Sequence, residues 1–146
     1  MDVLKDYLRL WAGGLPEPLP ERRPISLTVP ITVLGERNVQ RGSRGEFAKV
    51  RLTLHPASSV EVVDRIAEKE ELERLGVEWP DPVVLGLLDV LMLAEQGPLY
   101  KIAIVLEEVW YHDVDSSFLA FRHAGQHAGG KVIRELTQRR LWELNS

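Results

Sequence analysis

The segment between Pro80 and Gln96 limits the possible folds of this chain more than any other feature. Pro80-Asp81-Pro82 opens it, and proline is favoured in the first turn of a helix. The pattern therefore predicts a helix over residues 82–96, which Gly97-Pro98 ends. Its apolar side chains cover nearly the whole helix circumference: Val83, Val84, Leu85, Leu87, Leu88, Val90, Leu91, Met92 and Leu93. Such a helix must be buried on several sides, so other elements have to surround it.

Alternating apolar and polar residues predict four strands that bury this helix. They cover residues 25–34, 47–55, 60–66 and 99–109, and Pro30 places the first strand near an edge or a bulge. Residues 116–142 predict a second helix, in which Gly129-Gly130 is a candidate break because each interior glycine costs about 1 kcal/mol. The order of three strands, helix, strand and helix predicts an α/β (α+β) two-layer sandwich. In it, a four-stranded sheet carries two helices on one face.

The first 24 residues have a different pattern. Residues 2–11 predict a short helix, followed by Gly13-Gly14 and a stiff, proline-rich connector. We therefore expect two parts, residues 1–24 as an N-terminal helix with its connector and residues 25–146 as the domain. The N-terminal helix is expected to pack back through Tyr7 and Trp11.

Composition narrows the possible environments and functions. The 146 residues suit one domain, and the lack of cysteine excludes disulfides and thiolate zinc sites. No signal-peptide start and no apolar run of about 20 residues is present, so we expect a cytoplasmic chain without membrane partners. The net charge of -4 argues against a nucleic-acid binder that uses its whole surface. However, residues 36–51 are rich in arginine and lysine, whereas residues 68–78 are mostly acidic.

Two motifs have a specific resemblance. The first is Arg41-Gly42-Ser43-Arg44-Gly45-Glu46-Phe47, and the second is Tyr111-His112-Asp113-Val114-Asp115-Ser116-Ser117 followed by Ala120-Phe121-Arg122. They resemble the Gly-Gly-Arg-Gly-Gln-Tyr turn and the Tyr-His-Asp-Val-Asp-Ser-Ser and Ala-Phe-Lys segments of domain IV of translation elongation factor G. Val62-Val63-Asp64-Arg65-Ile66 also resembles that family's Phe-Val-Asn-Lys-Ile strand, so the match covers about residues 25–142.

The resemblance implies a ribosomal-protein-like sandwich with a left-handed crossover, an exception to the usual handedness. It also implies that the loop with His112 and the glycine turn lie at a tip that enters the decoding region of the small ribosomal subunit. The acidic residues 67–78 replace the family's Gly-Gly-x-Ile-Pro segment, and Trp110 replaces a small tip residue. No Gly-x-x-x-x-Gly-Lys-Ser/Thr loop occurs, so we expect no GTP binding.

The resemblance and the basic turn together predict contact with ribosomal or other structured RNA. The candidate RNA-binding residues form loop 110–113, turn 41–45 and one neighbour: Trp110, Tyr111, His112, Asp113, Arg41, Arg44 and Lys49. The three basic side chains suit phosphates, although Arg44 could equally pair with a local carboxylate. His112 could stack on a base or hydrogen-bond to RNA. One of Trp110 and Tyr111 should be exposed beside it while the other anchors the strand in the core.

Other interpretations of these residues stay open. Asp115, Ser116 and Ser117 predict a helix cap, and Ser116 or Ser117 beside His112 is only a weak nucleophile pattern, so we expect no enzyme and no cofactor. His123 and His127 share a helix face but lack a third metal ligand. The alternative function is a protein-interaction or structural domain that lost RNA contact. The apolar helix or the N-terminal helix is also a candidate homodimer surface.

Overall fold

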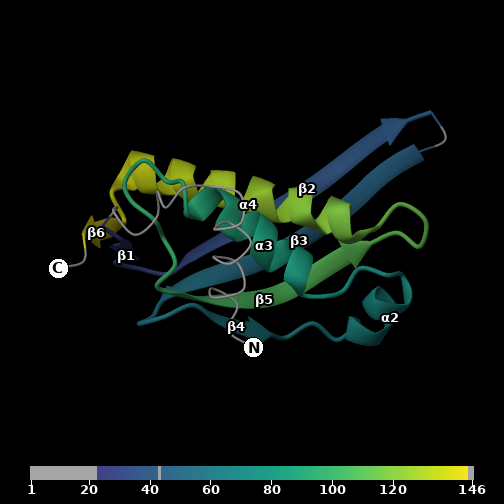
Figure 1. Cartoon of the computed structure of the whole chain (residues 1–146), viewed down its shortest axis with the longest axis horizontal. Coiled ribbons are helices and arrows are strands. Elements are labelled where there is room, and N and C mark those ends of the chain that lie inside the picture. Colours follow the sequence, from purple (N-terminus) through teal and green to yellow (C-terminus); the bar gives the residue numbers. More distant parts are fainter. Residues whose placement is uncertain (1–22, 43, 145–146) are drawn as a thin grey trace, which may run out of the picture.

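The computed structural model describes residues 23–42 and 44–144. One four-stranded sheet has helices α3 and α4 on one face (Figure 1). In chain order the elements are β1 (Ile25–Leu27), β2 (Ile31–Arg41), β3 (Arg44–Pro56), β4 (Glu61–Asp64), α2 (Lys69–Arg74), α3 (Asp81–Leu91), β5 (Ile102–Tyr111), α4 (Phe118–Arg139) and β6 (Trp142–Leu144). The predicted two-layer α/β fold is therefore confirmed.

The main sheet has the strand order β2-β3-β5-β4. The β2–β3 and β3–β5 pairs are antiparallel, whereas β4 lies parallel to β5. Alternate residues point to opposite faces of a strand, so Leu52 and Leu54 of β3 join Ile104 and Leu106 of β5 in the core under the helices. This alternation is the pattern that predicted the strands.

Glycines let the two large helices approach each other closely. A Cβ on Gly86 of α3 would lie 2.0 Å from the carbonyl oxygen of Arg122, and one on Gly125 of α4 would lie 2.4 Å from that of Val83. The predicted break at Gly129-Gly130 is wrong, because α4 runs unbroken from Phe118 to Arg139. Gly129 fits against Val90, so the helix packing that it permits offsets its low helix propensity.

The strand predicted over residues 25–34 is in fact two strands. The chain leaves strand geometry at residues 28–30 around Pro30, whose nitrogen cannot donate to a sheet. β1 then pairs with β6, a strand that the sequence did not predict, while β2 pairs with β3. The other boundaries shift by a few residues: the helix over 82–96 ends at Leu91, and the strand over 99–109 covers 102–111.

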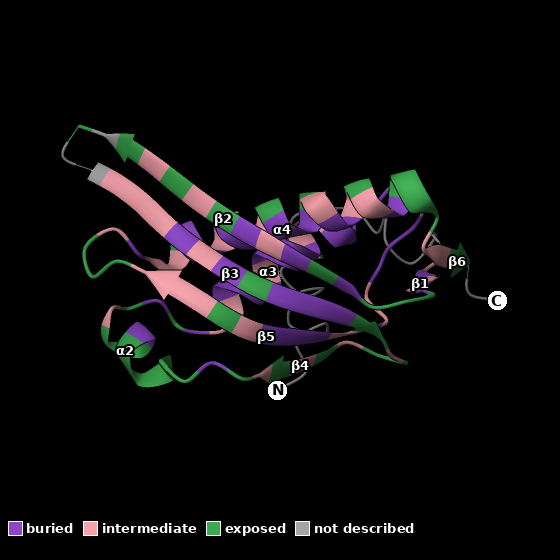
Figure 2. Cartoon of the chain, turned by 180° about the vertical axis from the view of Figure 1, so that it is seen from behind, coloured by how far each residue is buried: buried purple, intermediate pink, exposed green. Residues whose placement is uncertain are grey.

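The molecule has two different ends. At one end, the β2–β3 hairpin projects past the helices (Figure 2). Residues 36–40 and 45–47, near its turn, are half-buried or exposed, and its buried residues lie nearer the helices. At the opposite end, β1 and β6 form the small second sheet (Figure 1). The helix predicted over residues 2–11 lies outside the described residues. Within 23–42 and 44–144, no helix is long and apolar enough to cross a membrane.

Candidate functional site

The loop between β5 and α4 is tied to β3 by a short network. The Oγ of Ser116, which is 5% exposed, donates to the carbonyl oxygen of Phe47 at 2.7 Å. The same oxygen accepts from the backbone nitrogen of His112 at 2.9 Å. The backbone nitrogen of Phe47 in turn donates to the carbonyl oxygen of Asp115 at 3.0 Å. The buried Ser116 hydroxyl therefore donates one hydrogen bond and accepts another, and both bonds hold the loop against β3.

His112 stacks on an aromatic side chain of the neighbouring strand. Its ring lies 4.0 Å from that of Phe47, with an interplanar angle of 8°. The His112 side chain is 55% exposed, and its Nδ1 lies 3.9 Å from Oδ2 of Asp115. Asp113 and Val114, which follow it, are exposed. Phe47 of β3 thus covers one face of the imidazole, while much of the ring stays open to solvent.

Trp110 and Tyr111 point to opposite sides of the sheet, as expected of neighbours on a strand. Trp110 faces Lys49 across the β3–β5 pair, and the Lys49 Nζ lies 5.0 Å from the indole centroid, within cation–π range. Tyr111 packs against the core and donates its hydroxyl hydrogen to Glu71 of α2. That hydrogen bond, burial, and the charges of Glu71, Glu68 and Asp113 raise the Tyr111 pKa to about 12.

The hairpin turn and the loop meet through Asp115. Arg41 and Arg44 form the last pair of the hairpin, and Gly42 between them has a φ of 62°. Next to this turn, the Nε2 of Gln40 donates to Oδ2 of Asp115 at 3.4 Å. A Cβ on Gly45 would lie 3.1 Å from the same oxygen. The structure therefore brings turn 41–45 and loop 110–113 to the same end of the molecule.

The predicted capping role of this motif belongs to Ser117 rather than Asp115. Ser117 has extended backbone angles and is the N-cap of α4, and its Oγ accepts from the backbone nitrogen of Ala120 at 3.0 Å. Asp115 lies outside the helix, where its backbone and carboxylate face the hairpin, and Ser116 ties the loop to β3. Sequence spacing could not separate three adjacent residues that can each accept a hydrogen bond.

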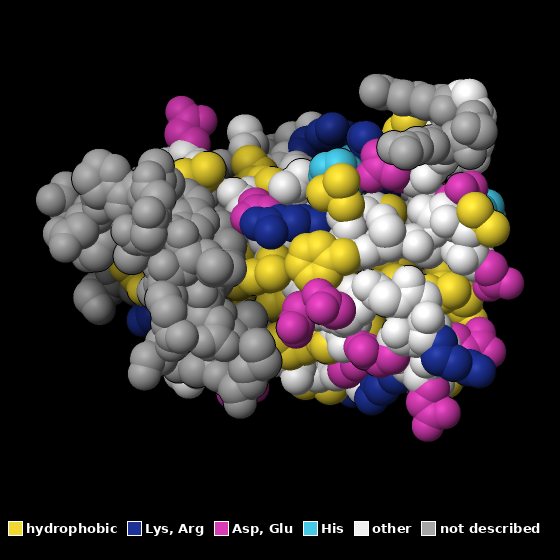
Figure 3. All heavy atoms as spheres, turned by 45° about the vertical axis from the view of Figure 1, so that its right-hand side comes forward, with side chains coloured by type: hydrophobic (Ala, Val, Ile, Leu, Met, Phe, Trp, Pro, Cys, Tyr) yellow, Lys and Arg dark blue, Asp and Glu magenta, His cyan; other side chains and the backbone are white. Residues whose placement is uncertain are grey.

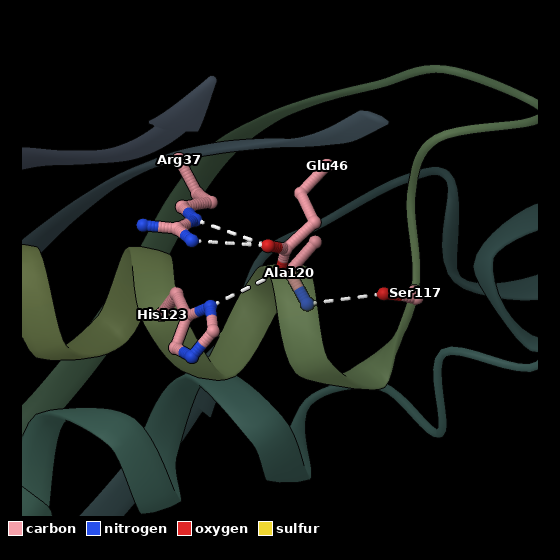
Figure 4. A network of polar contacts seen from close by, with 5 residues as sticks. All are labelled: Arg37, Glu46, Ser117, Ala120 and His123. Atoms are coloured by element: carbon pink, nitrogen blue, oxygen red, sulfur yellow. Dashed lines mark hydrogen bonds and ion pairs between the residues drawn. The ribbon is translucent and has the colours of Figure 1, made fainter. Parts of the chain in front are cut away.

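A second network holds the hairpin against α4. Glu46 of β3 accepts from Nη2 of Arg37 on β2 at 3.0 Å and lies 3.0 Å from Nδ1 of His123 on α4 (Figure 4). Burial alone would raise the Glu46 pKa, but hydrogen bonds and positive charge from Arg37 and His123 bring the pKa below its ordinary value. One turn further along α4, Nδ1 of His127 accepts from the backbone nitrogen of Glu36 at 3.0 Å.

These contacts bear on the metal-site interpretation of His123 and His127. The Nδ1 atoms of both rings already contact hairpin groups. In the described part of the chain, no three residues of the metal-binding types lie close enough to share an ion. The i, i+4 spacing of His123 and His127 was visible in the sequence. The sequence did not show that both side chains hold the β2–β3 hairpin against α4.

An acidic surface lies next to this end of the molecule. Exposed glutamates cover the segment around α2: Glu68, Glu70, Glu71, Glu73 and Glu78. The Tyr111–Glu71 contact joins this segment to the end of β5, and buried Leu72 and Trp79 anchor it in the core. Opposite charges therefore adjoin at one end of the molecule: basic residues occur on the hairpin sequence and acidic ones on α2.

Comparison with known proteins agrees with this architecture. No family model matches the chain. Over 107 residues it is 30% identical to elongation factor G 1 of Syntrophomonas wolfei subsp. wolfei, an alignment that covers 70% of this chain and 15% of that protein. The chain thus spans only a small part of that relative. A solved structure of a Thermus thermophilus protein matches with a TM-score of 0.66 and 25% identity, covering 84% of this chain and 18% of the other. With the two motifs placed together at one end, the chain is an elongation factor G domain IV-like protein.

Proposed function

We propose that this domain is a translation-related module that binds ribosomal or other structured RNA through its tip. The tip is defined here as loop 110–113, turn 41–45 and Lys49. The observation that carries the proposal is the meeting of turn and loop through Asp115 and Phe47 at the end opposite the paired β1 and β6 strands. A binding surface at the end of a projecting hairpin can reach into a recess that the rest of the domain cannot enter.

The chemistry of the tip suits RNA. Arg41, Arg44 and Lys49 carry the positive charge that phosphates require, and arginine can bind a phosphate through two parallel hydrogen bonds. His112 is stacked on one face by Phe47, so its orientation is set before a base arrives. Unstacked RNA bases are commonly recognised by stacking on aromatic side chains. Preorganisation lowers the entropy that binding would otherwise cost.

We infer that the module works by binding rather than by catalysis, and without GTP. His112 has Ser116 close by, but the Ser116 hydroxyl is buried and committed to Phe47 and to the backbone of His112. A nucleophile needs a free hydroxyl beside a base, so this pair is unsuited to hydrolysis. The sequence also lacks the glycine-rich lysine loop that holds nucleotide phosphates.

Cosedimentation of the chain with ribosomal subunits, at low and moderate salt, tests the proposal. Arg44→Ala should weaken binding and reduce the salt slope by about one unit for the lost phosphate contact. His112→Ala should weaken binding by about 1–3 kcal/mol while leaving the slope nearly unchanged. Arg139→Ala is the matched control, because Arg139 pairs with Glu135 near the C-terminal end of α4. If the wild-type chain does not cosediment, or if both tip variants bind like wild type, RNA binding by the tip is wrong.

The acidic surface of α2 favours a second candidate, a protein-interaction module. Its five exposed glutamates beside the tip would repel phosphate but would attract a basic protein segment. Replacing Glu70 and Glu73 by glutamine separates the candidates, since these side chains are exposed. The change should strengthen RNA binding under the first proposal, and it should weaken capture of a basic protein under the second.

A further inference from the structure

We propose that the outer face of the sheet, the face that points away from α3 and α4, carries a stacking platform for two neighbouring unpaired RNA bases. The platform is defined by Trp110, His112 and Lys49. This inference rests on the RNA binding proposed above and deepens it, because it names unpaired bases, in a loop or a single strand, as the ligand. In Figure 2 the strands lie in front of α3 and α4, so neither of these helices covers the outer face.

A β-bulge turns Trp110 onto the outer face. The strand pairing shifts between Arg51 and Leu52 of β3, which leaves Glu107 of β5 as an extra residue. Before the bulge, the even-numbered residues of β5 are buried under the helices. After it, Tyr111 packs against the core and its neighbour Trp110 points the other way. A bulge commonly re-aims the side chains that follow it, and strict alternation would have placed Trp110 in the core.

His112 lies on the same face, two residues beyond Trp110. Glu46 of β3 contacts α4, so the next residue, Phe47, points to the outer face. The imidazole of His112 stacks on Phe47, which places it on that face too. The His112 side chain is 55% exposed, and Trp110 is half-buried. Residues two apart along a strand are separated by about 7 Å, so the two rings are neighbours in one line.

This arrangement suits unpaired bases better than a duplex. Aromatic rings on the face of a sheet are one of the ways in which proteins bind RNA, and they do so by stacking on bases that are splayed out. The bases inside a duplex already stack on one another and cannot reach such rings. Two rings about 7 Å apart can each take one of two successive bases, once those bases are unstacked.

The charges on the outer face are mixed, so the rings rather than phosphate attraction select the ligand. Arg51 and Glu108 form an ion pair next to Trp110, and Glu36 lies opposite Lys49. Figure 3 likewise shows acidic and basic side chains intermingled on the side that it presents. The Lys49 Nζ lies 5.0 Å from the indole centroid. A base that stacks on Trp110 takes this place and leaves the ammonium free to bind its phosphate.

Fluorescence anisotropy with two forms of one RNA tests the platform. A labelled strand of about 12 nucleotides, made only of A and C so that it cannot pair with itself, is used alone or annealed to its complement. The wild-type chain should bind the single strand at least about tenfold more tightly than the duplex. Trp110→Leu should weaken single-strand binding about 5- to 150-fold with a nearly unchanged salt slope. Trp110→Phe, which keeps an aromatic ring, should restore most of the affinity.

Trp142→Leu is the matched control. Trp142 also lies beside a cation, with Cζ of Arg140 at 5.1 Å from its ring centroid, but it belongs to β6 at the end away from the tip. This variant should bind the single strand like wild type. Tryptophan fluorescence gives a second readout that does not depend on the leucine variants folding. The single strand should quench the wild-type emission, and most of the quenching should be lost in Trp110→Phe but kept in Trp142→Phe.

Three results would overturn the platform: no binding of the single strand, equal affinity for single strand and duplex, or Trp110→Leu binding like Trp142→Leu. Ribosome cosedimentation then separates the two proposals. If Arg44→Ala still weakens cosedimentation, RNA binding by the tip stands and the platform alone is wrong. If the wild-type chain binds neither the oligonucleotides nor the ribosomal subunits, both proposals fail.

Discussion

At the scale of single residues, the shape of the tip depends on a few small polar side chains. Ser116 holds the His112 loop on β3, and Ser117 caps α4. The contacts proposed for RNA, in contrast, come from larger side chains, and one of them, His112, lies on the loop that Ser116 holds. Substitutions of the two kinds should therefore separate the stability of the tip from its binding.

Ser116→Ala should destabilise the domain by about 1–3 kcal/mol, because it removes a buried hydroxyl that accepts from the backbone nitrogen of His112 and donates to the carbonyl oxygen of Phe47. Urea unfolding followed by circular dichroism measures the loss. Ser117→Ala should cost about 1 kcal/mol as a lost N-cap. Ser58→Ala, on an exposed turn, is the control and should be nearly neutral. A Ser116→Ala midpoint equal to that of Ser58→Ala would show that the loop does not need this clamp.

Glu46 should make the stability depend on pH in the acid range. Its pKa is lowered in the folded state despite burial, because Arg37 and His123 contact the carboxylate. The contribution is therefore fully present above the unfolded pKa and is lost as the pH falls through the folded one. Urea unfolding at several values between about pH 6 and pH 3 should show a shallower loss for Glu46→Gln than for wild type. Identical slopes would mean that the network is not coupled to folding.

At the scale of elements, the close approach of α3 to α4 is the main packing device. Gly86→Ala would place a methyl group 2.0 Å from the backbone oxygen of Arg122, which cannot swing away as a side chain could. The helices must then separate, at a cost of about 1–3 kcal/mol. Gly130→Ala is the matched control on α4, where a Cβ meets nothing within 4 Å. It should stabilise the domain by about 0.5–1 kcal/mol, and thermal unfolding should show shifts of opposite sign.

Elements with a strong internal period could be predicted from the sequence, and those defined by partners could not. The main strands and both large helices follow from alternating and helical apolar patterns. The β1–β6 sheet does not, because three-residue strands have too little pattern and their pairing depends on segments more than a hundred residues apart. Likewise, the histidine spacing on α4 was visible, but its purpose became clear only when Glu36 and Glu46 were placed opposite.

For the candidate site, the sequence indicated which residues to consider but not the contacts that hold them in place. The motif comparison brought the turn and the loop together, and the structure agrees. The stack of His112 on Phe47 could not be read from the sequence, because it depends on the register of β3 against the loop. The contact between Tyr111 and Glu71 was also not foreseen, since it joins residues 40 apart.

At the scale of the whole molecule, stability should fall from the packed base toward the tip. The hairpin between residues 36 and 40 has no buried residue, whereas Leu52 and Leu54 are fully buried. Native-state hydrogen exchange should thus show the amides of Val39 and Arg41 exchanging well before those of Leu52 and Leu54. Equal protection along the hairpin would contradict this gradient and would mean that the arm opens only when the whole domain unfolds.

The pairing of β1 with β6 also has a mechanical consequence. Ile25 lies opposite Leu144 and Leu27 opposite Trp142, so the described chain enters and leaves the domain side by side, at the end away from the hairpin. A force that pulls these two ends apart would peel the short pair open one hydrogen bond at a time. A load along the hairpin would instead strain the eleven paired positions of β2 and β3 together. The short β1–β6 pair should therefore open at a lower force than the hairpin.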